Sequence, residues 1–174
     1  MTQQELRPEE FDNYYQRYIN KVDAKTSLIN GFIEGKTNVI RFFNTIPEDK
    51  LLFKYQVDKW TIKEVFQHII DTERIFMHRC FRIARRDITP LSGFDQNIYI
   101  EPSRANNKSI ESLLKEFTLN REHSINLLKS FTDEDLKFIG NSNGGKMSAR
   151  AAAYTIIGHD IWHMEVIKDK YLTC

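Results

Sequence analysis

Two histidines four residues apart, His159 and His163, have the spacing of a metal-binding pair. On a helix such residues lie one turn apart on the same face, so both imidazoles can reach one ion. Helical steps from His159 meet Ile156 and Ala152 in one direction and Val166 in the other. We therefore expect the pair to face the interior of the protein.

This spacing by itself leaves two interpretations open. The segment has Asp160 where the H-E-x-x-H motif of zinc proteases has a glutamate, so a zinc protease is not indicated. Two histidines on an apolar stripe can be metal ligands, or they can be hydrogen-bonded core residues that hold no metal.

A third histidine, His68, lies in the middle of another amphipathic stretch, with Val65 and Ile75 on its own face. It too is expected to point toward the core. Three buried neutral imidazoles without partners would each leave a polar group unsatisfied. One shared cation satisfies all three, since each ring gives a lone pair and keeps an N–H for another acceptor. The sequence therefore predicts a divalent metal site formed by His68, His159 and His163.

Three carboxylates near these histidines in the sequence are candidates to accept hydrogen bonds from the ligand rings: Asp71, Glu73 and Asp160. The alternative for each is a solvated or salt-bridged surface charge. The remaining histidines, His78 and His123, have the positions of ordinary surface or edge residues. The sequence assigns no general base.

The elements that must position these residues are four amphipathic stretches, which predict long helices at about residues 24–43, 61–84, 109–131 and 148–169. The second begins with a capping box, Thr61-Ile-Lys-Glu64, and Ser148 is a suitable N-cap for the fourth. A shorter amphipathic segment, residues 14–22, is expected to be a lead-in helix. Residues 141–145 are expected to be a loop by composition.

The connection between the second and third helices, residues 86–108, is long and contains Pro90 and Pro102. A short loop would make the two helices antiparallel, whereas a non-helical crossover of this length lets them run parallel. The sequence thus predicts an all-α four-helix bundle with up-down-down-up topology. Phe94 and Tyr99 make the crossover a candidate lid or pocket wall.

The composition is that of a globular protein. The chain has 174 residues, of which 41% are apolar and 28% charged, and its formal net charge is +1. These values predict one domain of ordinary size spanning residues 1–174. Proteins that bind nucleic acid usually carry a basic excess, so nucleic acid is not expected as a partner.

The sequence also bears on the compartment. The first residues are polar and lack the apolar core of a secretory signal, and no apolar run approaches the roughly 20 residues of a membrane span. Cys80 and Cys174 make no disulfide framework. We therefore expect a soluble, cytoplasmic protein with no membrane partner. Cys80, in line with Phe76 and Ile83, is expected to be a buried apolar thiol.

Several longer segments form a recognisable pattern: Tyr14-Tyr15-x-x-Tyr18-Ile19, Trp60-Thr61-Ile62-Lys63-Glu64-Val65-x-x-His68-Ile69-x-Asp71, Phe76, Arg79, Arg82-Ile83-Ala84-Arg85, Pro90-Leu91-x-Gly93-Phe94-Asp95 and Gly158-His159-x-x-x-His163. They are spread from Tyr14 to His163, so the pattern spans nearly the whole chain. The pattern resembles that of the DinB-like, or YfiT-like, four-helix-bundle proteins, a bacterial family associated with damage or stress.

The resemblance implies an up-down-down-up bundle in which three inward histidines bind a divalent metal. Those positions match His68, His159 and His163. Many relatives have G-H-x-x-H-H in the last motif, whereas Trp162 precedes His163 here. This departure keeps both ligand candidates and places a bulkier, less polar side chain near the expected pocket mouth.

The expected cofactor is a divalent ion. Zinc and nickel come first for three imidazole ligands, and iron, manganese and copper can use the same set. Three protein ligands leave a coordination position for water or substrate, as in catalytic metal sites. Two chemistries on a small molecule follow: metal-dependent hydrolysis, or transfer through an activated low-molecular-weight thiol. The resemblance implies the second, since the wider family includes thiol-dependent S-transferases and isomerases.

Two non-catalytic alternatives stay open. The same bundle could hold a metal for stability or sensing, or serve as a stress-associated helical interaction module without a metal. An enzyme predicts an open metal site beside a pocket, and a binding module predicts a metal without a pocket. Homodimers are common among the relatives, so a homodimer is among the partners that the resemblance implies.

Overall fold

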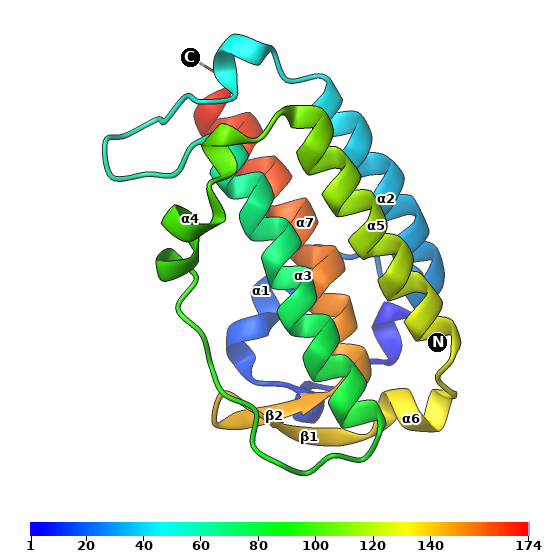
Figure 1. The fold of residues 1–174 in the computed structure, drawn as a ribbon. Helices are drawn as coiled ribbons and strands as arrows, with labels where there is room; N and C mark the ends of the chain where they lie inside the picture. The colour runs from blue at the N-terminus through cyan, green and yellow to red at the C-terminus, as the bar shows by residue number, and fades with distance from the viewer. Residues whose placement is uncertain (174) are drawn as a thin grey trace.

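Four long helices dominate the computed structural model, which describes residues 1–173. They are α2 (Leu28–Asn44), α3 (Ile62–Ala84), α5 (Ile110–Lys129) and α7 (Ala149–Tyr171). In Figure 1, α2 runs upward, α3 and α5 run downward, and α7 returns upward. The predicted all-helical bundle with up-down-down-up order is confirmed.

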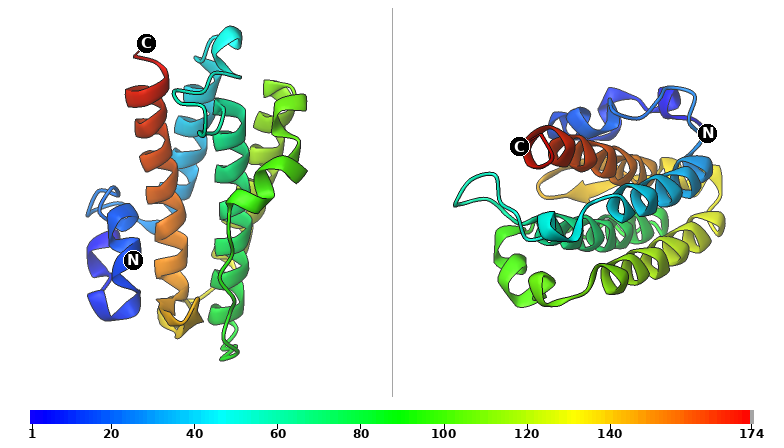
Figure 2. Two further views of the ribbon diagram at one scale, coloured as in Figure 1. Left: turned by 90° about the vertical axis from the view of Figure 1, so that its left-hand side faces the viewer. Right: turned by 90° about the horizontal axis from the view of Figure 1, so that it is seen from above.

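The four helices form a ring in which α3 contacts α5 and α7, and α2 contacts the same two helices. A short helix, α1 (Gln16–Ile19), packs against α7 from outside the ring, as Figure 2 shows from above. The neighbours α3 and α5 run parallel because the crossover carries the chain back along the bundle between them. The histidine-bearing helices α3 and α7 therefore lie side by side.

Hydroxyl side chains begin the two helices that carry the three histidines. Thr61 Oγ1 accepts a hydrogen bond from the N–H of Glu64, whose carboxylate accepts one from the N–H of Thr61, which is the predicted capping box. Ser148 begins α7 by accepting a hydrogen bond from the N–H of Ala151. These caps fix the starts of α3 and α7.

The first long helix begins later than expected, at Leu28 rather than near residue 24. The N–H groups of Gln3 and Gln4 donate to the carbonyl oxygens of Thr26 and Ala24. Because the N-terminus occupies these backbone groups, the segment before Leu28 stays out of the helix.

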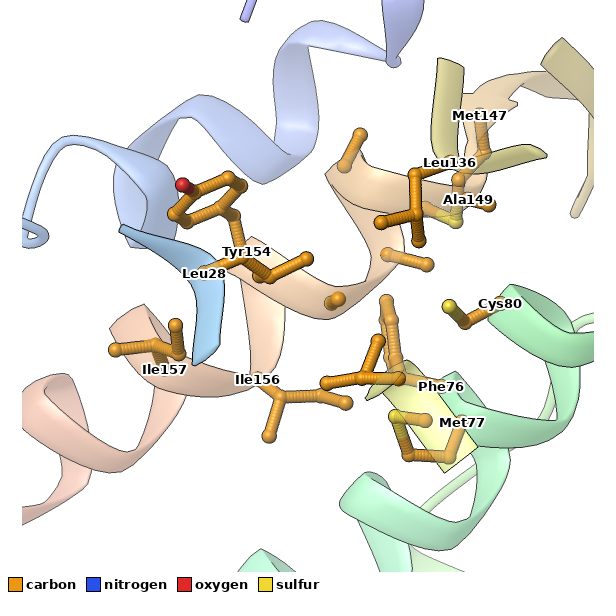
Figure 3. Close-up of a cluster of buried hydrophobic side chains, with 14 of the residues drawn as sticks. Leu28, Phe76, Met77, Cys80, Leu136, Met147, Ala149, Tyr154, Ile156 and Ile157 are labelled. Carbon is orange, nitrogen blue, oxygen red and sulfur yellow. The ribbon is translucent and has the colours of Figure 1, made fainter. Parts of the chain in front are cut away.

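Apolar side chains form two buried clusters along the bundle. The cluster at the hairpin end, drawn in Figure 3, joins Phe76 of α3 and Ile156 of α7 to Leu136 and Met147 between α5 and α7. The helical stripes predicted from the sequence supply most of both clusters. The second cluster includes Phe43 and Phe66, whose rings stack at 3.8 Å between centroids, and lies at the other end of α3.

Cys80 lies inside the cluster of Figure 3 and is 0% exposed. Burial raises the pKa of its thiol to about 12. The prediction of a buried apolar thiol is confirmed, and the raised pKa disfavours the nucleophilic thiolate form. Cys174 lies outside the described residues.

A β-hairpin occupies the segment that was expected to be a loop. Strand β1 (Ile139–Ser142) pairs antiparallel with β2 (Gly145–Ser148). The two residues between the strands, Asn143 and Gly144, have φ angles of 55° and 78°. Two consecutive positive φ angles form the tight turn that Asn-Gly favours in hairpins. The loop interpretation was therefore wrong, and the Asn-Gly pair was the signal in the sequence that could have corrected it.

The crossover between α3 and α5 is partly helical, contrary to expectation, and contains α4 (Asn97–Ser103). Just before this helix, the Asp95 carboxylate accepts a hydrogen bond from the N–H of Asn97 at 2.9 Å, as in an Asx turn. The first part of the crossover is attached to the hairpin, because Leu91 exchanges backbone hydrogen bonds with Asn141 and Asn143. The crossover then climbs along the bundle (Figure 1).

The remaining elements are short. The predicted lead-in helix is reduced to α1 and the 3-10 helix before it. The other short helices are η1 (Gln3–Glu5), η2 (Pro8–Glu10), η3 (Asn13–Tyr15), η4 (Glu48–Lys50), η5 (Ala105–Asn107) and α6 (Asp133–Lys137). Within residues 1–173, none of the helices combines the length and apolarity that crossing a bilayer requires.

Candidate metal centre

The structure brings His68 of α3 together with His159 and His163 of α7. All three side chains are buried. The Nε2 atom of His159 lies 3.1 Å from Nε2 of His68 and 3.0 Å from Nε2 of His163. One ring nitrogen from each residue lies within 4.8 Å of the other two. The residues singled out from the sequence therefore converge on one point.

Their spacing suits a divalent ion. For a tetrahedral zinc ion with Zn–N bonds of 2.0–2.1 Å, ligand nitrogens lie about 3.3 Å apart. The two measured separations are shorter than this by a few tenths of an ångström. A small outward movement of the rings would therefore accommodate the ion.

Hydrogen bonding among the three rings cannot satisfy His159. A neutral imidazole nitrogen carries either one proton or one lone pair, yet Nε2 of His159 faces the Nε2 atoms of both His68 and His163. It can make one good hydrogen bond and leaves the second contact unpaired. A cation that accepts a lone pair from each ring removes this conflict, so the three residues fit a metal better than they fit one another.

The rings are held in their neutral form. Burial lowers the pKa of His68 to about 4. Burial also places the pKa of His159 and of His163 well below the ordinary value, and the neighbouring rings lower them further. Neutral rings keep the lone pairs that a metal ion needs, so the site is ready to bind a cation at neutral pH.

A threonine that the sequence did not single out contacts the site. Thr72 Oγ1 lies 3.4 Å from Nδ1 of His68, one turn along α3. If Nε2 gives its lone pair to a metal ion, Nδ1 carries the proton and can donate a hydrogen bond to this hydroxyl. The spacing of four residues was the available signal. The Nδ1 atom of His163 is buried and has no hydrogen-bond partner within residues 1–173.

The three candidate acceptor carboxylates have other partners. Glu73 and Asp160 are buried against Arg121 of α5, which donates two hydrogen bonds of 2.9 Å to Glu73 and one of 2.6 Å to Asp160. Asp71 is half-buried and pairs with Arg74 at 2.8 Å. In the described part of the chain, no hydrogen bond joins these carboxylates to a ring nitrogen of the three histidines.

A glycine next to the first ligand allows α1 to approach. A Cβ atom at Gly158 would overlap the carbonyl oxygen of Tyr18. Because Gly158 has none, α1 packs against α7 and the Tyr18 ring contacts His159 edge to face at 5.3 Å. In the Gly158-His159 pair, the glycine lets α1 pack closely against α7 and the next residue is a candidate ligand.

A cavity of about 140 Å³ opens beside the histidines. Its walls come from the N-terminal segment, α3, α7, the crossover and the hairpin turn. The lining residues are Tyr14, Tyr15, Tyr18, His68, Thr72, Phe76, Arg79, Phe94, Gln96, Asn143, Thr155 and His159. A small molecule in this cavity would lie against two of the three candidate ligands.

The crossover contributes to this wall only in part. Phe94 lines the cavity, as the sequence suggested, whereas Tyr99 contacts Phe94 at 5.8 Å without lining it. Trp162, expected near the pocket mouth, is not among the lining residues. It packs against His163 at 4.7 Å and Tyr18 at 5.7 Å, where it covers the other side of the site.

The remaining histidines stay away from the site. His78 and His123 are exposed, on α3 and α5, as predicted. Of the histidine, cysteine, aspartate and glutamate side chains within residues 1–173, only His68, His159 and His163 gather into a group able to hold an ion.

Comparison with known proteins agrees with the fold and shows the family. The family model described as "DinB superfamily" matches residues 32–167. The solved structure of YfiT from Bacillus subtilis superposes with a TM-score of 0.73 at 17% sequence identity, covering 84% of this chain and 85% of that one. YfiT is described as a probable metal-dependent hydrolase with an unusual four-helix bundle topology. A search of curated proteins found no significant match.

Proposed function

The chain belongs to the DinB superfamily, and from this premise we propose that it binds one divalent metal ion through His68, His159 and His163 and uses it to act on a small molecule. The reaction that we propose first is metal-dependent hydrolysis. The observation that carries the proposal is the convergence of three buried, neutral imidazoles beside a cavity. The description of YfiT as a probable metal-dependent hydrolase supports this choice.

Each histidine has a distinct task in this proposal. His159 and His163 hold the ion from one helix, and His68 completes the set from the neighbouring helix. The Thr72 hydroxyl oxygen accepts a hydrogen bond from the Nδ1–H of His68, which leaves the lone pair of His68 on Nε2, facing the ion. A divalent ion held by neutral ligands keeps its full charge and can lower the pKa of a coordinated water or thiol.

The cavity supplies the place for the substrate. His68 and His159 form part of its wall, so a molecule bound there lies next to the ion's position. The aromatic side chains Tyr15, Tyr18 and Phe76 line the same space and give it an apolar wall. In such a setting electrostatic interactions with the substrate are stronger than in water.

Thiol transfer is the second candidate. The same ligand set can hold the thiolate of a low-molecular-weight thiol for attack on a substrate, and the cavity has room for a compact thiol beside the histidines. Zinc and nickel are the metals that we propose first, because borderline ions suit imidazole ligands. A metal held only for structure or sensing is the non-catalytic alternative.

Loading with cobalt(II) separates a catalytic site from a closed one. We expect the cobalt protein to show visible absorption bands that shift when azide is added, because three protein ligands leave a position for a small anion. Bands that do not respond to azide would indicate a saturated ion and contradict the enzymatic part of the proposal.

Activity assays then separate the two chemistries. We expect the zinc protein to hydrolyse 4-nitrophenyl acetate faster than its His163→Ala variant, whereas His123→Ala changes an exposed histidine and should behave as wild type. Conjugation of cysteine to 1-chloro-2,4-dinitrobenzene, with no gain in ester hydrolysis, would favour thiol transfer instead.

A further inference from the structure

Arg79 of α3 is a buried cation beside the candidate metal centre, with 2% of its surface exposed. Its Nη2 atom donates to the carbonyl oxygen of Ser92 at 3.1 Å. The guanidinium lies 4.8 Å from the ring centroid of Phe76 and 5.6 Å from that of Phe94. The side chain also interacts with the Tyr15 hydroxyl, but its Nε atom is buried and has no hydrogen-bond partner among residues 1–173. A buried polar group in this state costs free energy until something pairs with it.

The other arginines buried within residues 1–173 are paired with acids. Arg121 binds Glu73, and Arg150 binds Glu10. Arg121 grips the Glu73 carboxylate side-on, with hydrogen bonds of 2.9 Å from Nε and from Nη2. No carboxylate among residues 1–173 pairs with Arg79. The Nε atom of Arg79, which in Arg121 donates to a carboxylate, is therefore without an acceptor in this part of the chain. Arg79 therefore lacks the counter-ion that its buried counterparts have.

The cavity itself contains no negative side chain. Arg79 lines it together with His68 and His159, and the other lining residues offer hydroxyl, amide and aromatic groups but no Asp or Glu. A divalent ion held by the histidines would add a second positive charge at the edge of this space. Two positive charges in a low-dielectric region favour an anion between or beside them.

We propose that the cavity binds its substrate through a carboxylate, which Arg79 holds while the reacting end of the molecule faces the histidines. A carboxylate is planar and accepts two parallel hydrogen bonds from a guanidinium, as Glu73 does from Arg121. The identity of the reacting end rests on the proposed function. The preference for an anion rests on Arg79, and a bound metal ion would add to it.

A matched pair of probes tests this preference by isothermal titration at pH 7.5. The probes are 3-mercaptopropionate and its amide, 3-mercaptopropionamide, which have nearly the same size and differ in charge. Zinc-loaded wild-type protein is expected to bind the acid roughly tenfold or more tightly than the amide, since a hydrogen bond to a charged group outweighs a neutral one. Equal affinities for the two probes would overturn the proposal.

Variants assign the preference to Arg79. In Arg79→Gln the two affinities should become equal within about threefold while the amide binds as before. Arg82→Gln is the matched control, because Arg82 lies on the same helix, pairs with Asp87 and is not among the cavity residues. A preference for the acid that survives in Arg79→Gln would place the anion elsewhere and overturn the assignment.

Two further arms keep the test decisive. If Arg79→Gln does not fold, Arg79→Lys is used, because lysine keeps the positive charge but cannot donate two parallel hydrogen bonds to a carboxylate. Its preference for the acid over the amide should be weaker than that of wild type. The wild-type titrations are repeated on metal-free protein, where binding should be weaker but the preference for the acid should persist. Protein that never takes up metal contradicts the proposed function, and the metal-free titrations still decide the role of Arg79.

Discussion

Thr72 acts on the candidate metal centre through His68. Its hydroxyl lies 3.4 Å from Nδ1 of His68 and is the only protein group within residues 1–173 that contacts that nitrogen. An acceptor at this position fixes the tautomer in which Nε2 keeps its lone pair. The threonine is therefore a positioning residue for a ligand.

Replacing Thr72 by valine tests this role with little change in volume. We expect Thr72→Val to fold normally and to bind zinc about 10- to 100-fold more weakly, as measured by competition with a chelating dye. The control is Thr118→Val, because the Thr118 hydroxyl donates only to the Leu114 carbonyl of its own helix. Equal zinc affinity in Thr72→Val and wild type would show that Thr72 does not position His68 for metal binding.

The pKa of His68 makes the metal-free protein sensitive to acid. The ring has a pKa of about 4 in the folded protein and an ordinary value near 6.5 when unfolded. Above pH 6.5 both states are neutral and the free energy of unfolding does not depend on this ring. As the pH falls from 6.5 toward 4, the unfolded chain takes up a proton that the folded protein does not, so stability decreases.

Urea unfolding of metal-free protein at pH 7 and pH 5 measures this effect. From His68 alone we expect a loss of about 2 kcal/mol between the two values. His68→Gln should lose correspondingly less stability, whereas His78→Gln, at an exposed position, should lose as much as wild type. The same loss in His68→Gln as in wild type would show that the ring is not held neutral by burial.

At the scale of elements, one arginine joins three of the four long helices. Arg121 of α5 is fully buried and bridges Glu73 of α3 and Asp160 of α7. Burial raises the pKa of Asp160 to about 6, and the Arg121 charge opposes that rise. The bridge lies one residue from His159, so it also fixes the position of a candidate ligand along α7.

Removing this arginine should be costly. Arg121→Met leaves two buried carboxylates without a cation, and we expect a loss of about 3–5 kcal/mol in the free energy of unfolding at pH 7. Relative to wild type, the deficit should shrink at pH 5, because the pKa of Asp160, already raised by burial, rises further without the cation and the folded variant takes up a proton there. The control Arg74→Met breaks partly exposed ion pairs with Asp71 and Glu116 and should cost about 1 kcal/mol.

A deficit in Arg121→Met no larger than in Arg74→Met would mean that the buried bridge contributes little to stability. Chemical denaturation followed by circular dichroism at both pH values provides the comparison. Retained helicity in native buffer would show that the variant still folds.

Local signals explain which elements the sequence predicted. The capping box at Thr61 and the cap at Ser148 place the starts of α3 and α7, and the period of their apolar residues places the three histidines inward. The hairpin had a local signal too, the Asn143-Gly144 turn, but its strands are four residues each and carry little periodicity. Short strands are therefore easily taken for a loop.

Long-range partners explain what the sequence could not predict. Arg121 is separated from Glu73 by 48 residues and from Asp160 by 39, so nothing local indicates that they meet. The same holds for the N-terminal backbone that delays α2, and for Arg79, whose missing counter-ion shows only once the cavity is assembled. Such features depend on the packing of whole elements.

At the scale of the whole molecule, the cavity and the histidines lie where several separate segments meet. The cavity is lined by α1 at Tyr18, by α3 and α7, by the crossover at Phe94 and by the hairpin turn at Asn143. A metal ion bound by histidines of both α3 and α7 would link the two helices. Binding of the ion is thus coupled to the stability of the folded chain.

This coupling predicts stabilisation by metal. With free zinc at about 100 times its dissociation constant, the folded protein gains roughly 2.7 kcal/mol, which for a chain of this length raises the unfolding temperature by roughly 5–10 °C. Differential scanning calorimetry with and without zinc measures the shift. His163→Ala should show a much smaller shift, and a full shift in that variant would place the metal at other residues.

The metal content of tag-free protein, determined by inductively coupled plasma mass spectrometry, tests the central claim most directly. We predict about one divalent ion per chain in wild type and in the control His78→Ala/His123→Ala, which removes two exposed histidines, and almost none in His159→Ala/His163→Ala. Wild-type protein that holds no stoichiometric metal even after incubation with zinc or nickel would contradict the account, as would a double variant at His159 and His163 that keeps it.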